Sequence, residues 1–274
     1  MNTTPSDEEP TSVEREPTLV GSSDGAIPVM ADDETASAEY ASRFVGPVGR
    51  WMLQIQAEIL RSLVVPLIHP PPRALTMCDV GGGHGQVAEA LFEHIPPPAL
   101  TLTVTGSSAR SARRLTPLTA SGICTFTHAN LLALPYPNGA FEITSCIRLA
   151  SHTEHWRALI GELCRISAQR VIFEYPTWQS ANVLNFLTFR FKRAVEGNTR
   201  TFTLFSHREI EREFAKHGFH RQKRHPQFLF PMALHRALKR PRLSQALERF
   251  GSRSSLTAWL GSPVIAAFDK TSAQ

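Results

Sequence analysis

The sequence predicts a single α/β domain in which helices flank a mainly parallel central sheet, and two observations support this fold class. Short apolar segments alternate with stretches of helical periodicity from residue 74 to residue 175, a pattern typical of a parallel sheet covered on both faces. In addition, an apolar strand ends in Asp79 and continues directly into glycines at positions 81, 83 and 85. Open α/β sheets hold nucleotide-like ligands at such a turn, beyond the carboxyl end of the first strand.

The lead-in to the first strand is predicted to be helical. Apolar and aromatic residues recur at helical spacing over residues 39–65, and Gly46-Pro47 divides them into a short helix and a longer one. After the fifth strand, a helical insert rich in Phe and Leu is expected over residues 178–195. Strands are expected at residues 74–80, 100–105, 123–127, 141–147 and 170–175, and helices at 86–94, 107–115, 156–167 and 208–217.

The glycine turn is the first candidate binding element. Glycines at 81, 83 and 85 let the backbone turn sharply and let a ligand approach where a Cβ would clash. The helix that follows directs its free N–H groups toward the same crevice. The spacing, with Asp79 two residues ahead of the first glycine, differs from the dinucleotide fingerprint G-x-G-x-x-G. A ligand-binding turn and a purely structural turn are both compatible with this segment alone.

Charge is distributed unevenly along the chain. Residues 1–39 contain ten carboxylates and one arginine, so the net charge of +5 conceals a strongly basic remainder. We expect residues 1–38 to form a disordered acidic tail, because they contain few large apolar residues, and residues 39–270 to form the domain. The basic residues follow no nucleic-acid-binding motif. Contact with an anionic surface is expected to be weak at most.

The cysteines and apolar segments point to a reducing, aqueous compartment. The four cysteines show no C-x-x-C pair and no metal-type spacing, so we expect buried free thiols and no metal site. The sequence lacks the features of a signal peptide. The longest apolar stretch, residues 63–68, is too short for a membrane span. We therefore expect a cytoplasmic protein without a transmembrane segment.

Several motifs downstream of the glycine turn occur in the order of one known family. Residues 130–143 read Asn-Leu-Leu-Ala-Leu-Pro-Tyr-Pro-Asn-Gly-Ala-Phe-Glu-Ile, residues 163–174 contain Leu-Cys-Arg-Ile and Arg-Val-Ile-Phe-Glu, and residues 217–219 read His-Gly-Phe. With the turn at 81–85, these segments resemble class I S-adenosylmethionine-dependent methyltransferases of the methyltransferase type 11-like group. The resemblance implies a Rossmann-like fold, an enzyme, and S-adenosylmethionine as cofactor.

The resemblance also implies roles for individual residues. Asn130 would accept a hydrogen bond from the adenine amine, with Leu131 against the ring, although a plain turn-capping role is the alternative for Asn130. The loop that contains Arg148 and His152 would lie where cofactor and substrate meet. His152 would orient a nucleophile or take its proton; a packed core histidine is the alternative reading.

One expected residue is missing. Members of the family usually end the second strand with an acidic residue that accepts hydrogen bonds from both ribose hydroxyls, and that position falls on Gly106 or Ser107 here. No Asp or Glu occurs between Glu93 and Glu142. Three explanations stay open: serines 107 and 108 replace the carboxylate, the chain is an inactive binding or scaffold protein, or Arg110 and its neighbours accommodate the 2′-phosphate of NADP.

The resulting functional hypothesis is methyl transfer to a small molecule that is partly apolar and anionic. Residues 39–65 and 177–204 would cover the substrate, because both segments combine aromatic and aliphatic side chains with arginine and lysine. Cofactor contacts are expected from Asp79, Gly81, Gly83, Gly85, Gly106, Ser107, Asn130, Leu131 and Arg148, and a catalytic role from His152. The methyl donor arrives activated, so no nucleophilic triad is required.

Overall fold

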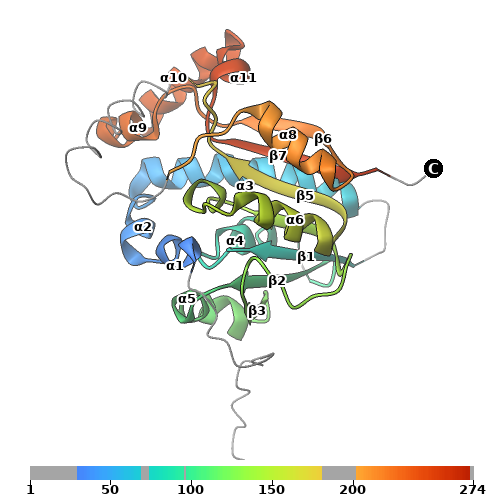
Figure 1. Cartoon of the computed structure of the whole chain (residues 1–274). Coiled ribbons are helices and arrows are strands. Elements are labelled where there is room, and N and C mark those ends of the chain that lie inside the picture. Colours follow the sequence, from blue (N-terminus) through green and yellow to red (C-terminus); the bar gives the residue numbers. More distant parts are fainter. Residues whose placement is uncertain (1–29, 69–73, 96, 181–201, 272–274) are drawn as a thin grey trace, which may run out of the picture.

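The computed structural model describes residues 30–68, 74–95, 97–180 and 202–271, which form a seven-stranded sheet with helices on both faces (Figure 1). The strand order is β3-β2-β1-β4-β5-β7-β6. Strands β1 to β5 pair in parallel, whereas β7 is antiparallel to both β5 and β6. The strands are β1 (Leu75–Val80), β2 (Leu100–Gly106), β3 (Thr125–His128), β4 (Phe141–Cys146), β5 (Ser167–Tyr175), β6 (Phe219–Pro226) and β7 (Val264–Lys270).

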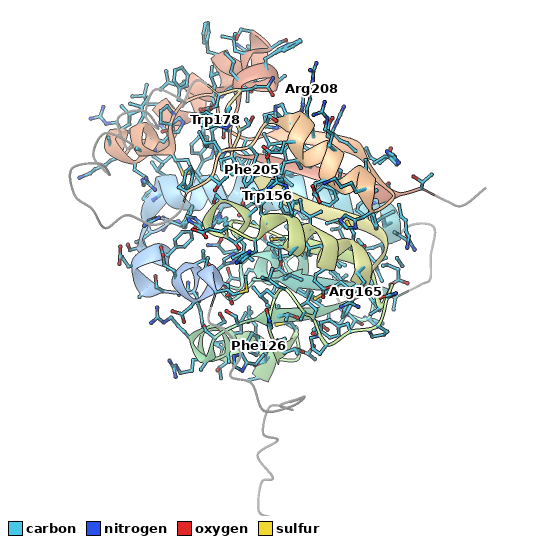
Figure 2. All side chains as sticks on the ribbon, in the orientation of Figure 1. Phe126, Trp156, Arg165, Trp178, Phe205 and Arg208 are labelled. Atoms are coloured by element: carbon cyan, nitrogen blue, oxygen red, sulfur yellow. The ribbon has the colours of Figure 1, made fainter. Side chains whose placement is uncertain are left out.

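Helices cover the sheet through two apolar clusters. On one face, α3 and α4 pack with β1 and β2, and Leu60, Leu63 and Met77 are buried there. On the other face, α6 and α8 pack with β5 and β7, and Trp156 of α6 contacts Phe205 at a ring-centroid distance of 5.1 Å (Figure 2). The helices are α1 (Ala31–Thr35), α2 (Ala38–Ser42), α3 (Gly46–Ile68), α4 (Gln86–Phe92), α5 (Ala109–Ala120), the 3₁₀ helix η1 (Ala150–His152), α6 (Trp156–Ile166), α8 (His207–Lys216), α9 (Met232–Leu238), α10 (Pro241–Arg253) and α11 (Leu256–Leu260).

The predicted α/β fold and its five parallel strands are confirmed, with strand boundaries that differ by three residues or fewer. The helix predicted at 107–115 begins later because Ser108 is its N-cap and accepts a hydrogen bond from the Ser111 N–H at 3.3 Å. Ser206 caps α8 in the same way, through the Glu209 N–H at 3.1 Å. The helix expected at 178–195 lies almost wholly outside the described residues.

Helix α3 is long and apolar enough, by length and composition alone, to cross a membrane. In the fold one side of this helix, with Leu60, Leu63 and Val64, is buried against the sheet, and 33% of its apolar window is buried. Pro66 lies in its last turn. This helix agrees with the predicted helical lead-in to the first strand.

The predicted boundary of the acidic tail at residue 38 is wrong for residues 30–38. These residues contain α1 and the start of α2, and Asp32, Thr35 and Ala36 are buried. Their acidic composition suggested disorder, but Met30 and Ala31 pack against the core cluster and Asp32 makes hydrogen bonds with the sheet. Residues 1–29 of the predicted tail lie outside the described part of the chain.

Candidate active site

The glycine turn lies at the carboxyl end of β1 and is sterically constrained. Gly81 and Gly85 have φ values of 76° and 75°, a region that L side chains avoid. A Cβ at Gly81 would lie 2.6 Å from Leu149 Cδ2, and one at Gly83 would lie 2.2 Å from Ser111 Oγ. The Gly81 N–H donates to the Thr105 carbonyl at 2.8 Å, which holds the turn beside the end of β2. The glycines are therefore required both by backbone conformation and by space.

Asp79 is buried directly beneath this turn. Its Oδ1 accepts a hydrogen bond from Ser145 Oγ at 2.6 Å, and its Oδ2 has no hydrogen-bond partner among the described residues. A Cβ at Gly82 would lie 1.9 Å from Oδ2, so the carboxylate packs against the turn. Burial raises the pKa of Asp79 to about 7. A buried acceptor without a donor at this edge fits a ligand that brings a cationic N–H group.

A carboxylate from another part of the chain, which the sequence did not predict, lies at the end of β2. Asp32 of α1 is fully buried, and its Oδ2 accepts a hydrogen bond from the Ser107 N–H at 2.7 Å. Its Oδ1 accepts a second bond from Ser107 Oγ, which in turn accepts one from the Met30 N–H at 2.7 Å. Burial raises the pKa of Asp32, and the bonds from Ser107 oppose this effect. No local sequence signal marks Asp32, because 75 residues separate it from Ser107.

The loop after β4 reaches the same edge of the sheet. Arg148 has a φ of 63°, and its guanidinium donates to Gln86 and to Gln56 Oε1, the latter at 2.6 Å. The same guanidinium lies 4.0 Å from the centroid of the Phe44 ring. The neighbouring Leu149 contacts the glycine turn, as described above. Arg148 thus joins α3, α4 and the lead-in helices at the predicted cofactor crevice.

Glu174, at the end of β5, belongs to this buried network. It accepts hydrogen bonds from Gln56 Nε2 at 3.2 Å and from Gln227 Nε2 at 2.6 Å. Burial raises the pKa of Glu174, while the positive charge of Arg148 acts in the opposite direction. Glu174 thus lies inside the protein, near enough to Arg148 to interact with its charge.

His152 lies at the end of η1 and is half-buried. Its ring packs edge-on against Phe202, with ring centroids 5.7 Å apart. The Thr203 N–H donates to the Ser151 carbonyl at 2.8 Å, which fixes this loop next to the residues that follow the insert. His152 is therefore placed beside the predicted substrate-covering segment, and its catalytic role stays a prediction.

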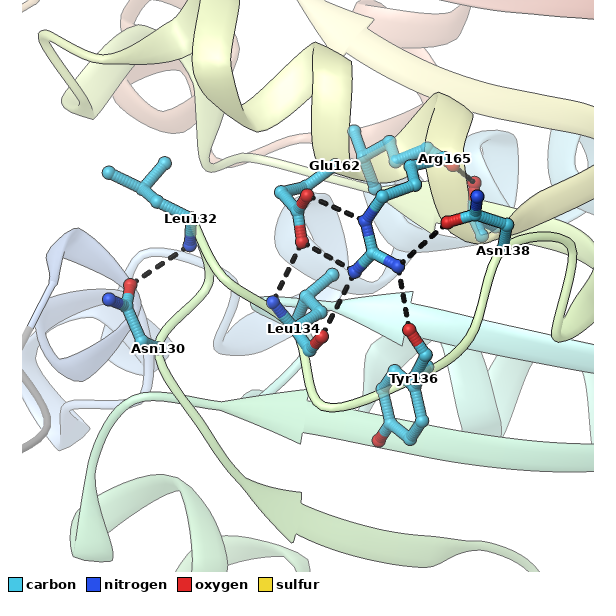
Figure 3. A network of polar contacts seen from close by, with 9 residues as sticks. Asn130, Leu132, Leu134, Tyr136, Asn138, Glu162 and Arg165 are labelled. Atoms are coloured by element: carbon cyan, nitrogen blue, oxygen red, sulfur yellow. Dashed lines mark hydrogen bonds and ion pairs between the residues drawn. The ribbon is translucent and has the colours of Figure 1, made fainter. Parts of the chain in front are cut away.

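Asn130 and Leu131 occupy the loop after β3. The Ala129 N–H donates to the Gly106 carbonyl at 3.0 Å, so this loop begins beside the end of β2. Asn130 Oδ1 accepts the Leu132 N–H at 3.0 Å (Figure 3), which is the turn-capping contact that the residue type favours. Leu131 is buried in the core cluster. Contacts of either residue with an adenine ring stay predictions.

A charged pair on α6 holds the next part of this loop (Figure 3). Arg165 donates to the carbonyls of Leu134 at 2.9 Å and Tyr136 at 2.6 Å, and to Glu162 at 2.8 Å. Glu162 Oε2 also accepts the Leu134 N–H at 2.8 Å. These contacts explain the Glu-x-x-Arg spacing on α6: the two side chains lie on one helix face and together bind the loop backbone.

The structure brings most of the predicted site residues to one edge of the sheet. Asp79, the glycine turn, Gly106, Ser107 and the start of the loop at Asn130 surround the ends of β1 and β2. Within the described part of the chain, no group of His, Cys, Asp or Glu could hold a metal ion. All four cysteines are buried free thiols, as expected.

Comparison with known proteins identifies the family. A family model described as a methyltransferase domain matches residues 52–223. The search of curated proteins gave no match. The chain is similar in structure to magnesium protoporphyrin IX methyltransferase from Synechocystis PCC 6803, solved with bound S-adenosylhomocysteine, with a TM-score of 0.59, 14% identity, and coverage of 88% of this chain and 98% of that one.

Two further solved structures show the same fold. The putative methyltransferase of Haloferax volcanii, in complex with the Trm112 activator, has a TM-score of 0.57 and 12% identity, with coverage of 89% of this chain and 99% of that one. Geranyl diphosphate C-methyltransferase from Streptomyces coelicolor A3(2) has a TM-score of 0.53 and 17% identity, with coverage of 79% and 75%. Because the family model spans more than half of the chain and agrees with the fold, this protein belongs to the class I S-adenosylmethionine-dependent methyltransferase family.

Proposed function

We propose that this protein transfers a methyl group from S-adenosylmethionine to a small molecule that is partly apolar and anionic. One observation carries the cofactor assignment: the glycine turn at the end of β1 lies directly over Asp79, whose buried Oδ2 lacks a donor among the described residues. The ammonium group of the methionine moiety would supply that donor. The positive φ values of Gly81 and Gly85 would shape the turn at which the ligand binds.

The substrate class is inferred from the charges around the lead-in helices. Arg43 lies 5.0 Å from the centroid of the buried Tyr40 ring, and Arg148 lies over Phe44. Burial, and after it the nearby charge of Arg43, lower the pKa of Arg236, so the charges of Arg43 and Arg236 repel each other here. An apolar molecule with an anionic group would relieve this repulsion and pack against the aromatic rings. Residues 39–65 and 177–204 are proposed to cover it.

The chemistry then requires little from the protein beyond alignment. When bound, S-adenosylmethionine supplies a methyl group on a sulfonium centre that is already activated for transfer. The buried site would exclude water and hold the acceptor in line. His152, beside Phe202, is proposed to take the proton that an O–H or N–H acceptor loses.

The alternatives raised by the sequence have less support. Arg110, which would attract the 2′-phosphate of NADP, forms an ion pair with Asp33 at 3.3 Å, and the buried Asp32 would repel that phosphate. An inactive scaffold would gain nothing from a buried unpaired carboxylate oxygen, since such a group costs about 1–3 kcal/mol.

Two further expectations concern partners and compartment. Weak contact with an anionic surface is supported by the segment from α9 to α11, residues 232–260, which contains six basic residues and one acidic residue. Four buried free thiols are compatible with the reducing environment of the cytoplasm. We propose a cytoplasmic enzyme that contacts such a surface without a membrane-spanning role for α3.

Isothermal titration calorimetry with S-adenosylmethionine and S-adenosylhomocysteine tests the cofactor assignment. The wild-type protein should bind both ligands. Asp79→Asn should weaken binding by roughly tenfold, since it removes one charge-assisted hydrogen bond worth about 1.5–3 kcal/mol. Absence of heat with either ligand, on protein whose fold is verified by circular dichroism, would defeat the proposal.

A further inference from the structure

The end of β2 poses a specific chemical problem for the proposed function. A bound ribose presents two neighbouring hydroxyl groups that need acceptors once water is excluded. Gly106 has no side chain, and the sequence from residue 94 to residue 141 contains no carboxylate. Ser107 Oγ already donates to Asp32 and accepts the Met30 N–H, and Ser108 Oγ already accepts the Ser111 N–H as the cap of α5. An acceptor from another part of the chain would meet this need without using these groups.

Asp32 lies where that acceptor is needed. A Cβ built on Gly106 would be 3.2 Å from Asp32 Oδ2, and a Cβ built on Gly81 would be 3.6 Å from Asp32 Cβ. The Asp32 carboxylate thus lies between the glycine turn of β1 and the end of β2. Asp32 Oδ2 is thus within the reach of a side chain attached at residue 106.

Asp32 lies close to residue 106 because that residue is glycine. The same Cβ at Gly106 would lie 3.0 Å from Ser111 Cβ and 3.1 Å from Phe126 Cε2, in addition to its contact with Asp32. A side chain at position 106 would therefore crowd Asp32, Ser111 and Phe126, and an acidic one would also place a second carboxylate beside Asp32. Glycine at the end of β2 is what allows α1 to bring its own carboxylate to this point.

The segment that carries Asp32 is anchored on both sides. Before it, the Met30 N–H donates to Ser107 Oγ at 2.7 Å, and Met30 and Ala31 pack against the core. After it, Asp33 pairs with Arg110 at 3.3 Å. Thr35 Oγ1 donates to the Asp32 carbonyl at 3.0 Å. These contacts hold the carboxylate in one position and do not depend on a bound ligand.

The Asp32 carboxylate accepts fewer hydrogen bonds from the protein than its two oxygens can accept. Oδ2 accepts one hydrogen bond from the Ser107 N–H, and Oδ1 accepts one from Ser107 Oγ. Each carboxylate oxygen can accept about two hydrogen bonds. By this count, one lone pair remains on each oxygen of the buried carboxylate, which equals in number the two hydroxyl groups of a ribose.

Resting on the proposed function, we propose that Asp32 of the N-terminal helix α1 replaces the carboxylate missing from β2 and accepts hydrogen bonds from the two ribose hydroxyls of the cofactor. Residues 30–35 are thus a structural part of the cofactor site. Cofactor affinity consequently depends on a segment that is remote in sequence from the glycine turn.

Calorimetry with S-adenosylhomocysteine on wild-type protein, Asp32→Asn and Asp269→Asn tests this proposal. Asp32→Asn should weaken binding at least tenfold, because an amide replaces the charged acceptor. Asp269→Asn is the matched control: it makes the same change in β7, at the ion pair with Arg170 near the start of β5, and should alter affinity less than threefold. Equal or tighter binding by Asp32→Asn would overturn the proposal and indicate that α1 obstructs the site instead.

A second arm separates a direct contact from a purely structural role. The 2′-deoxy analogue of S-adenosylhomocysteine should bind the wild-type protein more weakly than the parent ligand, and Asp32→Asn should bind the two ligands with similar affinity. If Asp32→Asn discriminates between them as strongly as the wild type, Asp32 does not contact the hydroxyl. Failure of the wild-type protein to bind S-adenosylhomocysteine would defeat the proposed function itself, whereas a defect confined to the Asp32 comparison would defeat only this inference.

Discussion

At the scale of single residues, the site depends on carboxylates that are kept out of water. Asp79 is buried under the glycine turn and receives one hydrogen bond, from Ser145. Burial of a carboxylate disfavours its charged form, and it raises the pKa of Asp79 from 3.8 to about 7. Burial of Asp79 therefore lowers the stability of the folded protein at neutral pH, where the exposed carboxylate of the unfolded chain is ionised.

This cost predicts a particular pH dependence of stability. Between pH 4 and pH 7 the unfolded chain ionises Asp79 while the folded chain keeps it protonated. The unfolded state then binds fewer protons, so the free energy of unfolding falls as the pH rises, by up to about 4 kcal/mol across this window. Asp79→Asn cannot ionise and lacks this contribution. Urea unfolding of both proteins at pH 4, 5.5 and 7 measures the difference; parallel pH profiles would contradict the prediction.

Residues of the site differed in how far the sequence could predict them. Asp79 and the glycines at 81, 83 and 85 are neighbours in sequence, and their spacing reflects a turn with positive φ at Gly81 and Gly85. Asp32 reaches Ser107 across 75 residues, within a segment whose composition resembles that of disordered chains. Its role follows from long-range packing, which no local pattern records. The sequence showed that position 106 has no carboxylate. It did not show that Asp32 lies beside this position in the fold.

At the scale of elements, α6 positions the loop that begins at Asn130. The Glu162–Arg165 pair binds the backbone at Leu134 and Tyr136, as Figure 3 shows. The loop begins beside the end of β2, where the Ala129 N–H meets the Gly106 carbonyl. A change in the conformation of this loop would therefore move backbone that lies beside the end of β2, at the proposed cofactor site. The sequence predicted α6 from its apolar periodicity, but it did not indicate which backbone groups its charged residues would hold.

Arg165→Lys should loosen this loop. A lysine has three donors on a single nitrogen and lacks the planar guanidinium, whose separate nitrogens reach the two carbonyls and Glu162 at once. We therefore expect the free energy of unfolding to fall by about 1–3 kcal/mol. Amide hydrogen exchange should accelerate over residues 131–139. Arg157→Lys is the control, because Arg157 is 57% exposed in its ion pair with Glu209, and such surface pairs are worth about 1 kcal/mol or less. A similar loss in both variants would argue against a specific role of Arg165.

At the scale of the whole molecule, basic and apolar groups gather on the helices inserted between β6 and β7. Figure 1 shows α9, α10 and α11 at the top of the molecule and α5 at the bottom. Phe250 and Trp259 on these inserted helices are 64% and 77% exposed. The sequence did not predict this insertion, because β7, the strand that ends it, is defined by antiparallel pairing with β5 and β6, which are remote in sequence.

These inserted helices should bind anionic vesicles weakly. Each basic residue near such a surface contributes about 1 kcal/mol, and exposed aromatic rings add apolar contact. The double variant Arg249→Gln/Arg253→Gln should therefore lower partitioning onto phosphatidylglycerol vesicles roughly thirtyfold in a sedimentation assay at low salt. Arg113→Gln/Arg114→Gln on α5 removes the same charge from exposed positions at the opposite end of the molecule and should have a much smaller effect. Equal losses in the two double variants would show that only net charge matters, and binding to neutral phosphatidylcholine vesicles would show that charge is not the cause.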